Sequence, residues 1–181
     1  MEVDQAIRTK RAVRAFSDKT IPDKALREIL NAGRRAQSSK NTQPWTFIAI
    51  RDRARLEALS KLGHVAGHLA GAAAAVAILT PDPAQRWSIM FDAGQAAAYM
   101  QLAAWHMGIA SCPATIYQPD AARTLLNFPD EVHLHVALSF GYPRNPDDLS
   151  APPKRGGRRS YDDSVHFETW SNKPSKPSDQ S

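Results

Sequence analysis

One uninterrupted stretch limits what this chain can fold into. From Ala84 to Met107 the sequence has no proline and one glycine, and its apolar residues recur at helical spacing on two stripes. A helix of about 24 residues would be about 36 Å long, whereas a compact domain of this size has a radius of gyration of about 16 Å. The stretch therefore predicts a helix that crosses the molecule and is buried on several sides, at the domain centre and at a dimer interface.

The remaining periodicity alternates between helical and extended segments. Helical spacing occurs at residues 3–7, 22–30, 53–62 and 119–126, and extended segments at 46–50, 75–79, 109–116 and 133–140. With 181 residues and ordinary apolar and charged fractions, the chain is expected to form one globular domain. Because the sequence after Trp170 has a disordered composition, we place the domain at residues 1–170 and a disordered C-terminal tail at residues 171–181.

Cysteine usage and charge narrow the class of protein. Cys112 is the single cysteine, so no intramolecular disulfide can form, and no Cys/His array has zinc-ligand spacing. Acidic Glu2 and Asp4 argue against a secretory signal, and no apolar run reaches the roughly 18 residues of a membrane span. We expect a cytoplasmic protein without a membrane partner. The formal net charge of +5 fits an anionic small molecule, a polyanion or solubility alone.

Two basic segments at opposite ends of the chain predict a phosphate site. Guanidinium groups donate paired, charge-assisted hydrogen bonds to phosphate oxygens, so Arg11, Arg14 and Arg158 can surround a phosphate dianion. The sequence has no Walker loop and no Gly-x-Gly-x-x-Gly after a strand, which excludes the common nucleotide motifs. It also has no nucleophile elbow, metal-ligand cluster or evident carboxylate pair. We therefore expect no catalytic side chain, and a cofactor that supplies the reactive atom.

Further motifs stand in a characteristic order. After the basic-x-basic segment before Phe16 come the loop Ser38-Ser39-Lys40-Asn41-Thr42-Gln43-Pro44-Trp45, the long helix from Phe91, the pair Cys112-Pro113, the turn Phe140-Gly141-Tyr142-Pro143 and the second basic segment. In this order and spacing, over about residues 3–170, the chain resembles the flavin-dependent nitroreductase family.

The resemblance implies an α+β fold with a mixed or antiparallel sheet flanked by helices. It implies an intertwined homodimer, with the long helix at the interface and one FMN at each of two interface sites. Lys10, Arg11 and Arg14 would contact the phosphate, ribityl chain or pyrimidine edge of the flavin. Arg158 and Arg159 would close the phosphate site.

The resemblance also implies which residues approach the flavin ring. The loop residues that would reach it from the partner chain are Ser38, Ser39 and Asn41, with Gln43 nearby. The residues that would pack along one face of the ring, with backbone amides near the reactive nitrogen, are Pro113, Ala114 and Thr115.

Three features depart from the family pattern. Ala12 stands where family members usually carry a small hydroxyl residue, so only its backbone N–H remains for the phosphate. Ser160 stands where the family often has proline, which leaves the alignment of Arg158 open and makes Arg155 the alternative. The stretch between Leu62 and Met90 is short relative to members with a helical lid, so the pocket is expected to be open or lined differently.

The activity that the resemblance implies is that of an FMN-dependent NAD(P)H oxidoreductase with ping-pong kinetics. NADH or NADPH reduces the flavin by hydride transfer and is replaced by a nitroaromatic, a quinone or a similar flat acceptor. Arg14 would help to stabilise the anionic reduced flavin. Within the same fold, the alternatives are a flavin-dependent dehalogenase and an enzyme that converts the flavin into a cobalamin ligand.

The same residues also allow functions that belong to other classes of protein. Lys154 to Arg159 would suit a basic, dimeric nucleic-acid-binding protein, although no aromatic residues interleave with the cations. Cys112 would be the candidate if the chain used a cysteine nucleophile. His64 and His68 have the i,i+4 spacing of metal ligands but lack an acidic third ligand, and we predict no metal site.

Overall fold

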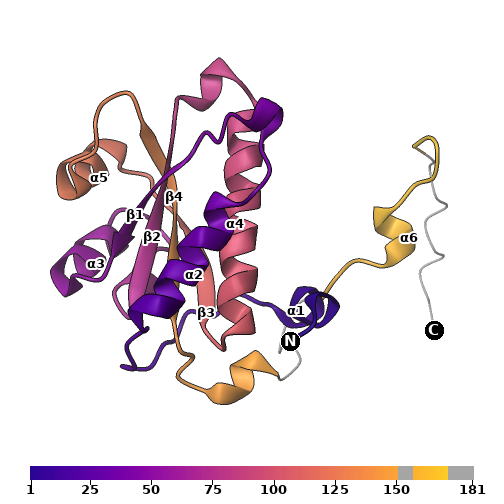
Figure 1. Cartoon of the computed structure of the whole chain (residues 1–181), viewed down its shortest axis with the longest axis horizontal. Helices are drawn as coiled ribbons and strands as arrows, with labels where there is room; N and C mark the ends of the chain where they lie inside the picture. Colours follow the sequence, from indigo (N-terminus) through magenta and orange to yellow (C-terminus); the bar gives the residue numbers. More distant parts are fainter. Residues whose placement is uncertain (151–156, 171–181) are drawn as a thin grey trace, which may run out of the picture. The chain divides into compact units, whose positions relative to one another are not determined.

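The computed structural model describes residues 1–150 and 157–170 of the chain (Figure 1). The chain divides into two compact units after Ser150. In the second unit, α6 (Tyr161–Ser164) begins where the Ser160 Oγ accepts a hydrogen bond from the Asp163 N–H at 3.1 Å. The predicted tail at residues 171–181 lies outside the described residues, and the predicted domain end at residue 170 stays a prediction.

An antiparallel sheet of four strands forms the centre of the first unit. The strands are β1 (Thr46–Ile50), β2 (Ala74–Thr80), β3 (Ala110–Thr115) and β4 (His133–Gly141). Their spatial order is β1-β2-β4-β3, so β3 lies at an edge. Every residue of β2 is buried, because helices cover both faces of the sheet there.

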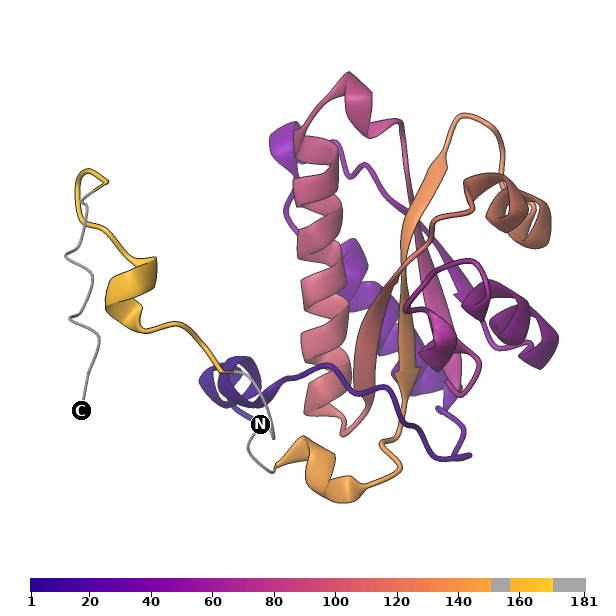
Figure 2. The same ribbon diagram turned by 180° about the vertical axis from the view of Figure 1, so that it is seen from behind.

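Two layers of helices enclose this sheet (Figures 1 and 2). The layers consist of α2 (Asp23–Arg34), α3 (Arg53–Ser60), α4 (Ser88–His106) and α5 (Pro119–Leu126), while α1 (Val3–Thr9) packs beside the last turn of α4. One apolar cluster joins α2 and α4 to the sheet, and a second joins α3 and α5 to its other face. In the part of the chain that the structure describes, no helix is long and apolar enough to cross a membrane.

The long central helix is shorter than the sequence predicts. It begins at Ser88 rather than near Ala84, because residues 83–85 form a separate 3₁₀ turn whose Ala84 N–H donates to the Asp82 carboxylate at 2.9 Å. Arg86 then adopts an extended conformation with φ −162° and ψ 120°, which separates the turn from the helix.

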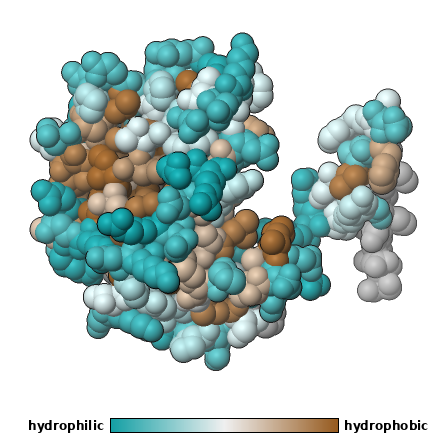
Figure 3. Space-filling view, in the orientation of Figure 1, coloured by the Kyte–Doolittle hydropathy of each residue, from teal (hydrophilic) through white to brown (hydrophobic). Residues whose placement is uncertain are grey.

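Within one chain, α4 is buried along one face only. Ile89, Met100 and Trp105 are at most 3% exposed, whereas Phe91 on the other face is 63% exposed. Residues on α1 add to the uncovered apolar surface, which Figure 3 shows in part. The predicted burial on several sides is therefore not achieved by the single chain.

Candidate functional site

The basic segment after α1 runs along the edge of the sheet beside β3. Ala12 forms an isolated parallel bridge with Ser111, and the Val13 N–H donates to the Ser111 carbonyl at 3.1 Å. Val13 and Phe16 are buried, whereas Ala12 and Arg14 are exposed. The two buried side chains fix the backbone, so the exposed residues of this segment are held in place at the surface.

The three cations of this segment have different contacts. Lys10 Nζ donates to Gln101 Oε1 on α4, and Arg11 Nε donates to the Thr9 carbonyl at 3.3 Å. Arg14 makes no hydrogen bond or ion pair with the described residues, and it lies close enough to buried His68 for its charge to act on that ring. Arg14 is therefore the cation of this segment best placed to bind an anion from outside.

The strand β3 presents the predicted ring-binding residues at the edge of the sheet. Pro113 and Thr115 are exposed, and Ala114 between them is buried. The Ile116 N–H donates to the His135 carbonyl of β4 at 2.9 Å, and in an antiparallel ladder Ala114 then also faces β4. Because proline has no N–H, Thr115 supplies the one outward amide of these three residues.

The connection between α3 and β2 lies against the end of β3, at the Thr115 carbonyl. Gly63 approaches the Thr115 carbonyl so closely that a Cβ atom at Gly63 would lie 2.1 Å from the oxygen. His68, in the 3₁₀ turn η2 (Gly67–Leu69), is 8% exposed, and its Nδ1 lies 2.8 Å from Ser139 Oγ. That hydroxyl donates to the Cys112 carbonyl at 3.2 Å, so Nδ1 of His68 must be the donor to Oγ.

Burial shifts the pKa values of His68 and Cys112, the two buried groups near Arg14, in opposite directions. Burial lowers the pKa of His68, the charge of Arg14 lowers it further, and the Pro113 carbonyl acts against both. Burial raises the pKa of the Cys112 thiol, while Arg14 and Lys10 act in the opposite direction. A fully buried thiol with a raised pKa is a poor nucleophile, which argues against catalysis by Cys112.

Metal binding gains no support from the described residues. Within residues 1–150 and 157–170, no group of three or more His, Cys, Asp or Glu side chains could hold a metal ion. The ring of His64 contacts that of Tyr117 in a tilted arrangement with centroids 4.8 Å apart, and His68 bonds to Ser139. The i,i+4 pair therefore has other partners in the fold.

The predicted loop at residues 38–43 is tightly held, although residues 39–43 are exposed. Lys40, Asn41 and Gln43 have φ values of 52°, 53° and 48°, in the left-handed region that non-glycine residues seldom occupy. The Ser38 Oγ accepts a hydrogen bond from the Gln43 N–H at 2.9 Å, which closes the loop. Such strain in a surface loop is typical of residues that are held in place for binding.

A buried carboxylate on α4 anchors this loop. Asp92 is 2% exposed, and both of its oxygens accept from the Ser39 N–H at 3.2 Å. Arg86 lies 3.8 Å from the same carboxylate and donates to Thr42 Oγ1 at 2.7 Å. We did not predict Asp92 as a site residue, although a single acidic residue in an apolar predicted helix could have indicated a buried polar contact.

The loop and the basic segment lie at opposite ends of α4 (Figures 1 and 2). Thr42 bonds to Arg86 just before the helix, and Trp105 Nε1 donates to Thr9 Oγ1 at 2.9 Å in its last turn. The 19 residues of α4 span about 28 Å at 1.5 Å per residue. One chain therefore does not bring these two predicted segments together.

The C-terminal arginines belong to the second unit. Arg158 and Arg159 are exposed and precede α6, while Lys154 and Arg155 lie outside the described residues. Their convergence with Arg14 on one phosphate therefore stays a prediction.

Comparisons with known proteins point to one family. The model of the nitroreductase family matches residues 7–68 and 62–142. A protein of Archaeoglobus fulgidus, named as a candidate NADH dehydrogenase/NAD(P)H nitroreductase, is 32% identical over 173 residues, which cover 91% of this chain and 96% of that protein. A similarly named protein of Methanothermobacter thermautotrophicus is 26% identical, covering 94% of this chain and 88% of that protein.

Solved structures confirm the predicted α+β fold with helices around an antiparallel sheet. An FMN-dependent nitroreductase from Clostridium difficile superimposes with a TM-score of 0.79 at 25% identity, covering 92% of this chain and 99% of that one. A structure from Bacteroides thetaiotaomicron gives a TM-score of 0.81 at 23% identity, covering 93% and 98%.

Removal of the Asp92 carboxylate is expected to release the loop and to destabilise the protein. The substitution Asp92→Ala should lower the free energy of unfolding by about 2 kcal/mol, since hydrogen bonds to charged groups contribute about 1.5–3 kcal/mol each. Urea denaturation measures this. The control is Asp120→Ala, whose carboxylate is 96% exposed and pairs with Arg123, and which should change stability far less. Equal effects of the two substitutions would contradict the anchoring role.

The buried neutral His68 is expected to make stability depend on pH. Its pKa is lowered in the folded state, so only the unfolded chain binds the extra proton as the pH falls below the ordinary value of 6.5. The stability due to neutral His68 is therefore complete above that value and is lost below it. Urea denaturation at pH 7 and pH 5 should show a smaller loss for His68→Gln than for the wild type. His106→Gln, at the exposed end of α4, should keep the full loss.

Proposed function

Because the chain belongs to the nitroreductase family, we propose that it is an FMN-dependent oxidoreductase that transfers electrons from NADH or NADPH to a flat acceptor such as a nitroaromatic or a quinone. The observation that carries this proposal is the exposed face of the edge strand β3 beside Arg14, a cation without a hydrogen-bond or ion-pair partner among the described residues. Relatives named as NAD(P)H nitroreductases and as an FMN-dependent nitroreductase support the cofactor and the donor.

The residues present are chemically suited to FMN. Three cations in five residues offer charge-assisted hydrogen bonds to a phosphate, and Arg14 has no competing partner among the described residues. Pro113 and Thr115 offer an exposed surface with one outward amide, which suits a ring that is apolar on its faces and polar at its edge.

In this proposal the protein binds and orients while the cofactor reacts. FMN, when bound, supplies the hydride-accepting and hydride-donating chemistry. Arg14 would donate charge-assisted hydrogen bonds to the phosphate, and the Thr115 N–H would donate to an atom at the ring edge. The hydrogen bond between Lys10 and Gln101 keeps Lys10 beside the C-terminal half of α4.

A homodimer would complete this site. The loop at residues 38–43 and the basic segment lie at opposite ends of α4 in one chain, so we propose that the loop reaches the flavin bound by a second copy. The uncovered apolar face of α4 would form the interface: Trp87 is 81% and Phe91 63% exposed, and their rings lie 6.4 Å apart. Contiguous exposed apolar side chains of this kind are typical of interfaces between proteins.

The proposed function predicts a yellow protein. The purified chain should show flavin absorbance, heat should release FMN, and anaerobic mixing with NADH or NADPH should bleach the spectrum. A folded sample that stays colourless after incubation with excess FMN would contradict the proposal. Binding to duplex DNA with a steep salt dependence would instead favour the nucleic-acid reading of the C-terminal basic segment.

Arg14 should contribute strongly to FMN retention. The substitution Arg14→Ala is expected to raise the Kd for FMN about tenfold to a hundredfold, because a hydrogen bond to a charged group contributes about 1.5–3 kcal/mol. Fluorescence titration of the protein stripped of flavin measures this. Arg8→Ala is the matched control, since its side chain is 73% exposed on α1 and pairs with Asp4. Unchanged affinity in Arg14→Ala would place the phosphate site elsewhere.

A further inference from the structure

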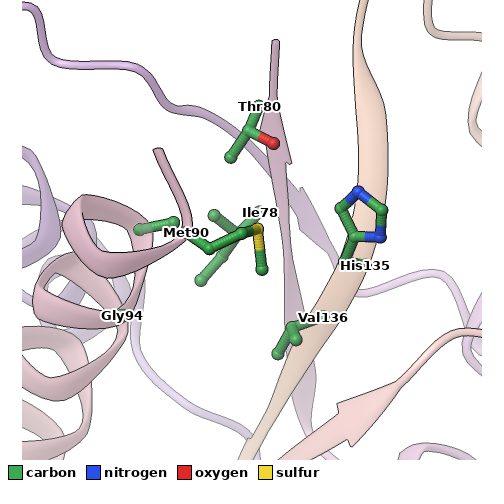
Figure 4. A pocket seen from close by; sticks show the side chains of 7 residues that line it. Ile78, Thr80, Met90, Gly94, His135 and Val136 are labelled. Atoms are coloured by element: carbon green, nitrogen blue, oxygen red, sulfur yellow. The ribbon is translucent and has the colours of Figure 1, made fainter. Parts of the chain in front are cut away.

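A β-bulge turns a histidine toward a small pocket beside the first half of α4. In the ladder of β2 and β4, Ile78 lies opposite Val136 but Leu79 lies opposite Leu134, which makes His135 the extra residue. A bulge re-aims the side chain of the strand that carries it. As a result, neighbouring His135 and Val136 both line the same pocket (Figure 4).

The pocket is apolar along most of its wall. It has a volume of about 80 Å³ and lies between Ile78 and Val136 of the sheet and Met90 and Gly94 of α4. A Cβ atom at Gly94 would meet no heavy atom within 4 Å, so the helix leaves open space there. An engineered cavity of about 150 Å³ holds a whole benzene molecule. This pocket therefore suits one edge or substituent of a flat ring.

Two residues that line the pocket each carry a buried polar atom without a partner among the described residues. Thr80 is 2% exposed, and in the part of the chain that the structure describes neither its Oγ1 nor His135 Nε2 has a hydrogen-bond partner. Figure 4 shows the Thr80 hydroxyl oxygen on the side of the pocket where His135 lies. Buried polar groups without partners are unfavourable, and a ligand that bonds to them removes this cost.

The imidazole of His135 is suited to donate one hydrogen bond. Burial lowers its pKa, the neighbouring His133 lowers it further, and Asp82 acts in the opposite direction. The ring is therefore neutral near pH 7, with one N–H. An apolar pocket with a few placed donors is the usual composition of a small-molecule site.

The pocket adjoins the surface of β3 proposed to contact the flavin ring. Val136 lies directly opposite Thr115 in the ladder of β3 and β4. Side chains of such a cross-strand pair lie on the same face of the sheet, about 5 Å apart. The pocket therefore lies beside the proposed flavin surface, so a flat molecule next to the flavin can extend one edge into it.

We propose that this pocket is the subsite that selects the electron acceptor, a flat aromatic compound with an oxygen at its edge. The nitro group or quinone carbonyl enters the pocket, and the Thr80 hydroxyl and the His135 Nε2–H donate to its oxygen. The inference rests on the proposed function, because the acceptor must lie next to the flavin.

The test uses the FMN-loaded protein with the substitutions Thr80→Val and His135→Phe, which remove the donors and keep the approximate shape. The flavin is reduced with dithionite and then mixed with nitrobenzoate, benzoquinone or ferricyanide in a stopped-flow instrument. Half-saturating concentrations of the first two should rise about tenfold per lost hydrogen bond. Reoxidation by ferricyanide, a small inorganic oxidant without such an edge, should not change.

Two controls separate the pocket from general damage to the protein. Thr46→Val makes the same substitution at an exposed position of β1 and should behave like the wild type. Thr80→Ser keeps the hydroxyl and should restore saturation by both organic acceptors.

The possible outcomes are distinct. Unchanged saturation by nitrobenzoate and benzoquinone in both variants would overturn the inference. Weaker FMN binding with unchanged acceptor saturation would assign the pocket to the cofactor. That result would also overturn the inference. Because dithionite replaces NAD(P)H, failure of NADH and NADPH to reduce the wild type would count against the proposed function alone.

Discussion

The packing of α4 against the sheet is the constraint on which the rest of the structure depends. Ala93 and Met100 are buried in one apolar cluster with residues of β2 and β4, so the helix cannot shift without exposing the core. Asp92 near one end and Gln101 near the other reach out from this fixed helix to the loop and to Lys10. A single buried helix thereby sets the positions of both predicted binding segments.

Buried polar groups extend this arrangement to the edge of the sheet. Asp92 is satisfied by Ser39 and Arg86, and His68 bonds through Ser139 to the Cys112 carbonyl. Polar groups are tolerated in an apolar interior when they are hydrogen-bonded, and such bonds have strict geometry. Each of these contacts therefore holds a surface segment in one position, as a cofactor site requires.

The uncovered face of α4 links the fold to the proposed assembly. An apolar helix that is packed on one side and bare on the other is incomplete as a monomer, which favours a second copy. The same incompleteness affects the site, because the loop and the basic segment of one chain lie at opposite ends of the helix. Dimerisation would thus cover apolar surface and assemble the flavin site in one step.

The sequence by itself determined the order of the helices and strands, the family and the cationic segment, because periodicity, turn residues and motif spacing are local properties of the chain. The predicted strand at residues 46–50 and the helix at 119–126 match β1 and α5 in their bounds. Only the tertiary structure decided that Asp92 anchors the loop, that His68 is buried beside Ser139, and that His135 is the extra residue of a bulge. These features depend on strand register and on contacts between distant residues, and no local pattern in the sequence specifies which distant groups meet.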